Sequence, residues 1–373
     1  MDADSPAGRR YCVGLLEKLV DIPSVFPHEE EVMLFLEREL TALGLRPTRF
    51  DVEERRFNLL CTVGSGSPRV CLNAHADTVP PNGQSTPSAR IEGDLLYGLG
   101  SCDDKAAIAA MVTAFLELAS RADDLGGTAD LLISVDEDGD GRGVRTALEQ
   151  GYRCDLAIVG EPTSLNVVHA HCGMLFLNLT TSGVAAHGSN PSDGVNAIER
   201  MMALVDELRG AVTRFDPYPG IGEPSMNLGV IQGGDRPNRV PSQCAAQVDI
   251  RVVPTTRLAD VYQAVEDVFA GKEWAHWNVD KEGESMETPV GSLLVQTVLS
   301  SAGSLGIESR PWYLRGWTEA EPFRTHLGID AVVVGPGHIL QAHSSNEYTS
   351  ISQTQRAAAL YADVVTRLCR GDD

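Results

Sequence analysis

The hydrophobic positions in the first half of the chain change their period from segment to segment. Residues 29–43 and 104–119 repeat apolar residues at helical spacing, and the second segment is alanine-rich and apolar on most faces. Short apolar runs of strand length stand at 70–73, 130–135 and 155–159. Because helices alternate with apolar strands, the pattern predicts a mostly parallel sheet with helices on both faces.

The middle of the chain alternates apolar and polar residues, as strands with one exposed face do. The strands predicted here are 175–181, 226–231, 243–252 and 277–280, and the helices are 196–210 and 259–270. Their order predicts a compact α+β domain of about 110 residues, within the usual domain size.

After residue 286 the chain again combines helical patterns with an apolar strand, as in its first half. A helix is predicted at 292–302, an apolar strand at 331–334 and a last helix at 352–369. We therefore predict an α/β fold with two parts. Residues 1–175 and 286–373 form a domain around a mostly parallel sheet with helices on both faces, and an α+β domain at 176–285 interrupts it.

Charge and hydropathy narrow the range of partners. The 373 residues include 52 acidic and 30 basic side chains, a formal net charge of −22. Such a field repels nucleic acid and anionic membrane surfaces, so neither is an expected partner. No apolar run approaches the roughly 20 residues of a membrane helix, and the N-terminal segment lacks the order of a signal peptide. These features predict a cytoplasmic protein.

The eight cysteines are spread over the chain, and no two of them form a CxxC pair. That distribution favours reduced, mostly buried thiols over a disulfide framework or a cysteine-ligated zinc site. The chain also has no GxSxG elbow, no GxxxxGKS/T phosphate loop, no GxGxxG and no HExxH. These absences weaken serine-hydrolase, nucleotide-binding and dehydrogenase functions.

Residues with metal-binding or acid–base side chains follow the predicted strands. His75 comes after the strand VCLNA, Glu137 and Asp138 after LLISV, Glu161 after LAIVG, and His343 shortly after AVVVG. In an open α/β sheet, ligands bind beyond the carboxyl ends of the strands. No single residue is diagnostic, but their agreement indicates one site at that edge of the sheet.

Each residue also has a simpler explanation. His75 and Asp77 fit a surface histidine beside a turn aspartate, or a metal-bound imidazole whose second nitrogen is held by Asp77. Asp103, just before the buried helix, is either an ordinary N-cap or a carboxylate that bridges two cations. Glu137 and Asp138 repel each other unless a cation or proton intervenes, although a charged loop also fits.

Glu161 and His343 are equally compatible with surface loops. Residues 136–141 resemble the start of a calcium loop. An EF-hand, however, needs a bidentate glutamate at position twelve, where Ala147 stands, and a helix in front, where a strand is predicted.

Seven segments, taken together and in this order, resemble the two-zinc family of aminoacylases, acyl-amino-acid deacetylases and carboxypeptidases. They are LYGLGSCDDK, AIVGEPTSLNVVHAHCG, HGSNPSDGVNAIE, NLGVIQGGDRPNR, QVDIRVVP, GWTEAEPF and GPGHILQAHSSNEY. Within the family, GWTEAEPF and VGPGHILQAH make the acetylornithine deacetylases the most similar subgroup.

The resemblance implies a centre with two divalent metal ions, zinc first, with cobalt or manganese as alternatives. One ion would bind His75 and Glu161, the other would bind Asp138 and His343, and Asp103 would bridge the two.

The resemblance also implies roles around the ions. Glu137 would be the general base, and Asp77 would orient His75. The inserted domain would be a dimerisation lid in a homodimer, and His187 of the partner subunit's lid would donate to the developing oxyanion.

Three further residues are candidates for binding substrate. A guanidinium matches the two-pronged geometry of a carboxylate, so Arg251, together with Asn238, is a candidate for the substrate carboxylate. A salt bridge between strands and a turn amide are the alternatives for these two. Glu319 is a candidate for meeting a cationic substrate side chain.

Two places depart from the family's usual residues. Asp138 stands where the acidic pair is usually Glu–Glu, and its side chain is one methylene shorter, so its loop must approach by roughly one carbon–carbon bond. We expect a second ion that is held less firmly or is a different metal. Asp104 and Ala106 replace the common Met and Gly, and Asp104 is expected to add negative charge near the ions.

The function predicted is hydrolysis of the amide bond of an N-acyl amino acid, a small molecule. The first candidates are N2-acetyl-L-ornithine and N-acetylcitrulline, giving acetate and the free amino acid. A succinyl-diaminopimelate-type desuccinylase or a metallo-exopeptidase would use the same centre. A metal-binding or ligand-binding relative without catalysis is the alternative of another class.

Overall fold

The computed structural model describes residues 2–371, which divide into two compact units. Unit 2 consists of Ala170–Glu287 and Tyr313–Trp317. Unit 1 is the rest of the described chain, that is, the residues up to His169, Thr288–Trp312 and those from Thr318 on. The sequence placed the insertion at 176–285, so unit 2 starts earlier and also takes up a short later segment. No helix among the described residues is long and apolar enough to cross a membrane.

Unit 1 is built on a sheet with the strand order β1-β2-β6-β3-β7-β15-β8. Its strands are β1 (Thr48–Glu53), β2 (Arg56–Gly64), β3 (Arg69–His75), β6 (Thr128–Ser134), β7 (Leu156–Val159), β8 (Val167–His171) and β15 (Asp330–Val333). The four central strands β6, β3, β7 and β15 run parallel, and the strands beyond them pair antiparallel. The mainly parallel sheet predicted from the sequence is thus confirmed.

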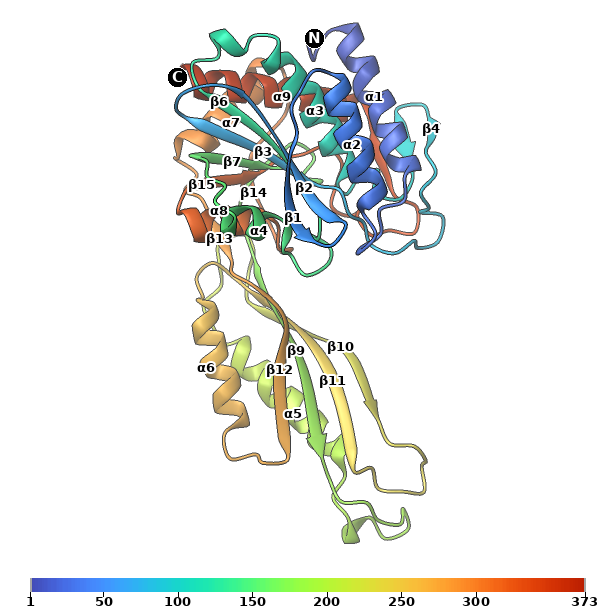
Figure 1. The fold of residues 1–373 in the computed structure, drawn as a ribbon. Helices are drawn as coiled ribbons and strands as arrows, with labels where there is room; N and C mark the ends of the chain where they lie inside the picture. Colours follow the sequence, from blue (N-terminus) through green and yellow to red (C-terminus); the bar gives the residue numbers. More distant parts are fainter. Residues whose placement is uncertain (1, 372–373) are drawn as a thin grey trace. The chain divides into compact units, whose positions relative to one another are not determined.

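Helices cover both faces of this sheet (Figure 1). They are α1 (Pro6–Asp21), α2 (Glu30–Ala42), α3 (Lys105–Ala119), α4 (Gly143–Glu149), α7 (Leu293–Ser304), α8 (Ala320–Leu327) and α9 (Ile351–Arg370), with a 3₁₀ turn at Ala122–Asp124. α3 packs against α9 and α1 over β3, whereas α4 and α8 contact each other on the opposite face. Strands buried on both faces read as continuous apolar runs, as β6 does with every residue buried.

α3 forms the centre of the larger core. Its residues from Lys105 to Leu116 are all buried, because it lies between the sheet and α9. Gly160, just after β7, lets the helix come this close. A Cβ built there would lie 2.6 Å from the Cβ of Ala107 and 2.7 Å from Oδ2 of Asp104.

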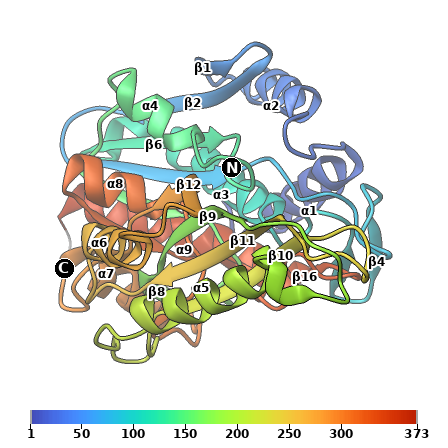
Figure 2. The ribbon, with the colours of Figure 1, turned by 90° about the horizontal axis from the view of Figure 1, so that it is seen from below.

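A small antiparallel sheet beside this core has the order β16-β5-β4, formed by β4 (Arg90–Glu92), β5 (Leu95–Tyr97) and β16 (Tyr348–Ser350). At the edge of the main sheet that β1 and β2 form, α4 contacts both of these strands (Figure 2). β16 leads directly into α9, whose N-cap is Ser350.

Unit 2 is an antiparallel sheet with the order β10-β11-β9-β12, packed against two helices. Its elements are β9 (Gly173–Ser182), α5 (Ala197–Val212), β10 (Ser225–Gly233), β11 (Gln243–Val252), α6 (Leu258–Phe269) and β12 (Ala275–Gly283), with a 3₁₀ turn at Pro191–Asp193. β13 (Met286–Glu287) pairs with the end of β8, and β14 (Pro311–Leu314) also pairs with β8. Alternate residues of β11 are buried against α5 and α6, which explains the alternating pattern of the sequence.

Candidate metal centre

The carboxyl ends of the four parallel strands bring the candidate residues together. His75 is the last residue of β3. Glu137 and Asp138 follow β6 by three and four residues, and Glu161 follows β7 by two. His343 lies in the loop between β15 and β16, and its φ of 56° places its backbone in the left-handed region. The geometry follows from a parallel sheet, whose strands all end at one edge.

His75 lies at the centre of one group of ligand atoms. Its Nε2 is 3.0 Å from Oδ1 of Asp103 and 4.0 Å from Oε1 of Glu161. Its Nδ1 faces Asp77, 3.2 Å from the backbone oxygen and 3.5 Å from Oδ1. The ligand atoms of His75, Asp103 and Glu161 lie within 4.8 Å of one another. One ring nitrogen thus faces two carboxylates while Asp77 holds the other.

His343 lies at the centre of a second group. Its Nε2 is 3.3 Å from Oδ1 of Asp138 and 3.4 Å from Oδ2 of Asp103. Asp103 therefore directs one carboxylate oxygen toward each histidine. A carboxylate placed in this way has the geometry to bridge two cations.

Another group of close ligand atoms combines His75 with Asp77 and Asp138. Both oxygens of Asp77, however, already accept backbone hydrogen bonds. Oδ1 accepts from the Glu137 N–H at 3.2 Å, and Oδ2 accepts from the Asp138 N–H at 2.9 Å. We therefore assign Asp77 to holding the loop and His75, and we group Asp138 with His343.

The neighbouring carboxylates raise the pKa values of both histidines. Burial lowers the pKa of His75, but hydrogen bonds to Asp103 and Asp77 outweigh it and raise the pKa well above its usual range. Hydrogen bonds to Asp103 and Asp138 raise the pKa of His343 to about 10. Burial raises the pKa of Glu161 well above its usual range, and the charges of Asp103 and Glu137 add to this.

The donor set fits a pair of divalent cations. Imidazole nitrogens and carboxylate oxygens are the ligands that zinc and neighbouring transition metals take in proteins. Burial has the largest effect on the pKa values of Asp138 and Glu161, and the neighbouring groups that act on them are carboxylates and the two histidines. Buried carboxylates that repel one another are stabilised by cations between them.

Glu347 organises the segment before the bridging aspartate, and sequence reasoning missed it. Its buried carboxylate accepts hydrogen bonds from the N–H groups of Gly100, Cys102 and Asp103 at 2.9, 2.8 and 3.1 Å. Burial raises its pKa to about 7. The available signal was an acidic residue within GPGHILQAHSSNEY, the segment that also carries His343.

Asp104, expected to add negative charge near the ions, is buried at the start of α3. It occupies the N-cap position of α3 without a side-chain cap bond, and its fully buried carboxyl has no hydrogen-bond partner among the described residues. Burial raises its pKa well above the usual range, and the charge of Asp103 adds to this while that of His75 opposes it. Burial and the charge of Asp103 thus favour the neutral form of this carboxyl.

Glu319, expected to meet a cationic substrate side chain, is instead buried inside unit 1. Its carboxylate accepts hydrogen bonds from the hydroxyl of Ser134 and from the Val144 N–H, the latter at 3.1 Å. Burial raises its pKa to about 7. Because only 1% of Glu319 is exposed, we do not include it among the proposed substrate-binding residues.

The other three predicted residues belong to unit 2. His187 is exposed in the loop after β9, and its Nδ1 lies 2.8 Å from the hydroxyl of Ser189. Asn238 is exposed between β10 and β11, where its backbone oxygen accepts from the Gly188 N–H. Arg251 forms an ion pair of 2.9 Å with Asp249, which lies on its own strand rather than on a neighbouring one.

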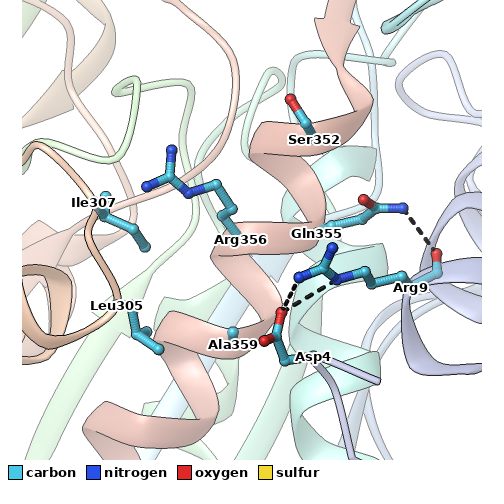
Figure 3. A pocket seen from close by; sticks show the side chains of 8 residues that line it. All are labelled: Asp4, Arg9, Leu305, Ile307, Ser352, Gln355, Arg356 and Ala359. Atoms are coloured by element: carbon cyan, nitrogen blue, oxygen red, sulfur yellow. Dashed lines mark hydrogen bonds and ion pairs between the residues drawn. The ribbon is translucent and has the colours of Figure 1, made fainter. Parts of the chain in front are cut away.

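A separate pocket of unit 1, about 230 Å³ in volume, lies among the N-terminal segment, α9 and the loop after α7 (Figure 3). Its two guanidinium groups already have protein partners. Arg9 forms an ion pair with Asp4, and Arg356 donates to the backbone oxygen of Gly306. This pocket offers no group of metal ligands comparable to that around Asp103.

Known proteins that resemble this chain include metal-dependent hydrolases, in agreement with the cluster of candidate metal ligands. The pattern of the peptidase family M20/M25/M40 matches residues 71–367. An acetylornithine deacetylase of Pasteurella multocida (strain Pm70) is 32% identical, over 93% of this chain and 94% of that protein.

Solved structures share the fold at low identity. An M20 family metallo-carboxypeptidase from Sulfolobus solfataricus has a TM-score of 0.84 at 17% identity, covering 96% of this chain and 99% of its own. The YXEP protein of Bacillus subtilis, a dinuclear metal binding peptidase from the M20 family, has a TM-score of 0.73 at 13% identity, covering 98% and 99%. The predicted family and enzyme class are confirmed: the chain belongs to the peptidase family M20/M25/M40 and is a metal-dependent hydrolase.

Proposed function

We propose that this protein hydrolyses the amide bond of an N-acyl amino acid, with N2-acetyl-L-ornithine or a close analogue such as N-acetylcitrulline as substrate. The observation that carries the chemistry is the position of Asp103, whose two oxygens face His75 and His343 separately. The choice of acyl group is supported by the acetylornithine deacetylase that is 32% identical over most of both chains.

The residues divide into two sets of ligands with a shared bridge. In this proposal His75 and Glu161 hold one cation, Asp138 and His343 hold the other, and Asp103 joins them. Two bound divalent cations, zinc in this proposal and cobalt or manganese otherwise, would supply the Lewis acidity that polarises the acyl carbonyl and makes a water molecule more acidic.

Glu137 moves the proton. It follows the end of β6 by three residues, is half-buried, and its charge raises the pKa values of both His75 and Glu161. Its carboxylate takes the proton from the attacking water and returns it to the leaving amine, the two roles of a general base and acid. Asp77 keeps the His75 ring in place and holds the backbone of Glu137.

We further propose that the protein acts as a homodimer through the inserted domain. His187 of the partner subunit then donates a hydrogen bond to the oxyanion as the acyl carbon becomes tetrahedral. Arg251 and Asn238 bind the substrate carboxylate in this proposal, which requires Arg251 to exchange its ion pair with Asp249 for the ligand.

We also propose that the protein resides in a reducing compartment such as the cytoplasm. All eight cysteines are buried, and none is in a disulfide. Free thiols of this kind are usual where glutathione keeps proteins reduced.

The test is a kinetic screen with a matched variant. Acetyl, formyl and succinyl derivatives of ornithine, citrulline, lysine and diaminopimelate are assayed with zinc and with cobalt, following release of the acid. Acetate release from acetylornithine or acetylcitrulline is expected to have the highest kcat/KM. Release of succinate or of a C-terminal residue, with no acetate, would assign the protein to the desuccinylases or exopeptidases instead.

The variant Glu137→Gln separates catalysis from binding. It keeps the size of the side chain and removes the base, so kcat should fall by about 10² to 10⁴-fold. Metal content, measured by atomic emission, should stay at the wild-type value. A wild type inactive on every substrate in the panel, with a Glu137→Gln variant indistinguishable from it, would favour a binding protein without catalysis.

A further inference from the structure

A buried aspartate begins the loop that carries the base. We call residues Asp136–Arg142 the acidic loop. The carboxylate of Asp136 folds the loop onto itself, because Oδ1 accepts from the Asp140 N–H at 3.2 Å and Oδ2 accepts from Nε of Arg142 at 2.8 Å. Its carbonyl accepts from the Gly141 N–H at 2.7 Å. The φ of Asp136 is 74°, a left-handed conformation that aspartate tolerates better than most residues.

A buried arginine ties this aspartate to the rest of unit 1. Nη2 of Arg56 donates to Oδ1 of Asp136 at 3.0 Å, and Nε and Nη2 donate to the two oxygens of Glu29 at 2.9 and 2.6 Å. The side chains are 6% exposed for Arg56 and fully buried for Glu29 and Asp136. The guanidinium carbon also lies 4.8 Å from the centre of the Phe26 ring. Arg56 thus joins the first residue of β2, the start of α2 and the acidic loop, in the region where α2 and α4 contact β2 (Figure 2).

The acidic loop is held on its other side by Asp77. That carboxylate accepts the N–H groups of Glu137 and Asp138. The backbone of these two residues therefore runs between two buried carboxylates, Asp77 and Asp136. Of the two, Asp136 has its charge balanced by a buried guanidinium.

A buried ion cluster is weak evidence for stability, because the cost of removing charges from water offsets most of their attraction. The value of such a cluster lies in the geometry that it enforces. Here the geometry matters because Asp138 is one methylene shorter than glutamate, so its reach toward a metal depends on where its backbone is fixed.

We propose that Arg56 is a positioning residue, which fixes Asp136 and thereby places Glu137 and Asp138 against the bridging carboxylate of Asp103. The inference rests on the proposed roles of Glu137 as base and Asp138 as ligand. Arg56 itself touches neither substrate nor metal.

The test compares Arg56→Met with Arg49→Met. Arg49 lies on the neighbouring strand β1, pairs through two nitrogens with Glu37 of α2, and lies over the Phe57 ring at 3.9 Å. Arg49→Met therefore also loses an ion pair to α2 and a ring contact, at a more exposed position and without a link to the acidic loop. Both metal-free proteins are titrated with Zn²⁺ by calorimetry and with Co²⁺ by its visible absorption. Circular dichroism and urea unfolding show that each variant is folded.

Arg56→Met should weaken the less tightly bound ion on the order of 10–100-fold, the usual effect of removing a residue that orients a ligand. It should also lower kcat with little change in KM, because Glu137 acts in the transition state. Arg49→Met should keep the wild-type affinities for both ions. Wild-type affinities in folded Arg56→Met, or an equal loss in Arg49→Met, would overturn the inference.

Asp136→Asn provides a second route where Arg56→Met is not obtained folded, because it breaks the same link from the loop side. It should weaken the same ion, and combining it with Arg56→Lys should weaken it no further; a purely additive loss would contradict a shared role. These affinities are measured without substrate. A protein that binds two ions in this manner but cleaves no N-acyl amino acid would refute the proposed function and leave the role of Arg56 standing.

Discussion

In the proposed centre, Asp138 is the ligand on which the second ion depends. Its Oδ1 is 3.3 Å from Nε2 of His343, and burial raises its pKa while the hydrogen bond from His343 opposes that rise. The short side chain reaches the histidine because Asp77 holds the Asp138 N–H at 2.9 Å. We expect this position of the backbone to offset the shorter side chain that stands in place of the family's usual glutamate.

Removing the Asp138 carboxylate should release one of the two proposed ions and leave the other bound. Asp138→Ala is expected to lower bound metal from two ions per chain to about one, because it leaves His343 and the shared Asp103 as the proposed protein ligands of that ion, fewer than the three or four that zinc sites use. Atomic emission after dialysis against a weak chelator measures the ratio. Asp138→Glu is the control and should keep the second ion; loss of both ions in Asp138→Ala would mean that the sites are not independent.

Glu319 should make stability depend on pH. Its pKa is 4.5 as a free side chain and about 7 in the fold, where it is fully buried. Between these values the unfolded chain releases the proton that the folded chain keeps, so the free energy of unfolding falls as pH rises from 4.5 to 7. The shift corresponds to about 3 kcal/mol.

Urea unfolding of the metal-free protein at pH 4.5 and pH 7.5 measures this effect against Glu319→Gln. The wild type should lose about 3 kcal/mol more than the variant over this range. Equal pH dependence of the two proteins would show that Glu319 keeps an ordinary pKa.

At the scale of elements, the segment before α3 is held in place by a residue distant in sequence. Glu347, beside the small sheet β16-β5-β4, accepts three N–H groups from residues 100–103. The carboxylate is suited to this because both of its oxygens accept. A glutamine has one acceptor, so its amide nitrogen would face at least one N–H donor.

Glu347→Gln should therefore destabilise unit 1 by about 1–3 kcal/mol, the cost of unsatisfied buried donors. Because Asp103 is one of the three donors, affinity for metal should fall on the order of 10-fold. Denaturant unfolding and metal titration measure the two effects. Glu39→Gln is a control, since Glu39 accepts a single hydrogen bond from Tyr11 and an amide oxygen can replace it. Unchanged metal affinity in Glu347→Gln would show that Asp103 is positioned by other contacts.

At the scale of the whole molecule, the proposal divides catalysis between subunits. If His187 acts on the partner's site, two inactive variants should restore each other. A mixture of Glu137→Gln and His187→Asn, refolded or exchanged together, would form mixed dimers in half of all pairs, each with one complete site. About a quarter of the wild-type activity is then expected, from the random pairing of two subunits.

Activity assays of the separate and mixed variants measure this, with sedimentation confirming the dimer. Each variant alone should be nearly inactive while keeping its metal content. Mixtures that remain as inactive as the separate variants would place His187 outside the reaction or in its own subunit's site.

The sequence by itself determined the strands, the helices and the edge of the sheet where chemistry gathers. Residues 243–252 form β11 as predicted, and the apolar segment 104–119 forms α3 from Lys105. The spacing of apolar residues is enough to predict these elements, because the buried faces of a helix or strand determine which consecutive positions are apolar. His75, Glu161 and His343 follow predicted strands, and parallel strands end at one edge whatever their order along the chain.

Only the tertiary structure decided how these residues are held. Arg56 meets Asp136 across 80 residues, and Glu347 meets Gly100 across 247. Such contacts depend on side-chain direction and on the distance between elements. The spacing of apolar residues along the sequence gives information on neither. Glu319 shows the same limit, because its chemistry suggested a substrate contact while packing buried it against Ser134. The candidate ligands could be found from the ends of strands, but the buried groups that contact them could be found only from the packed core.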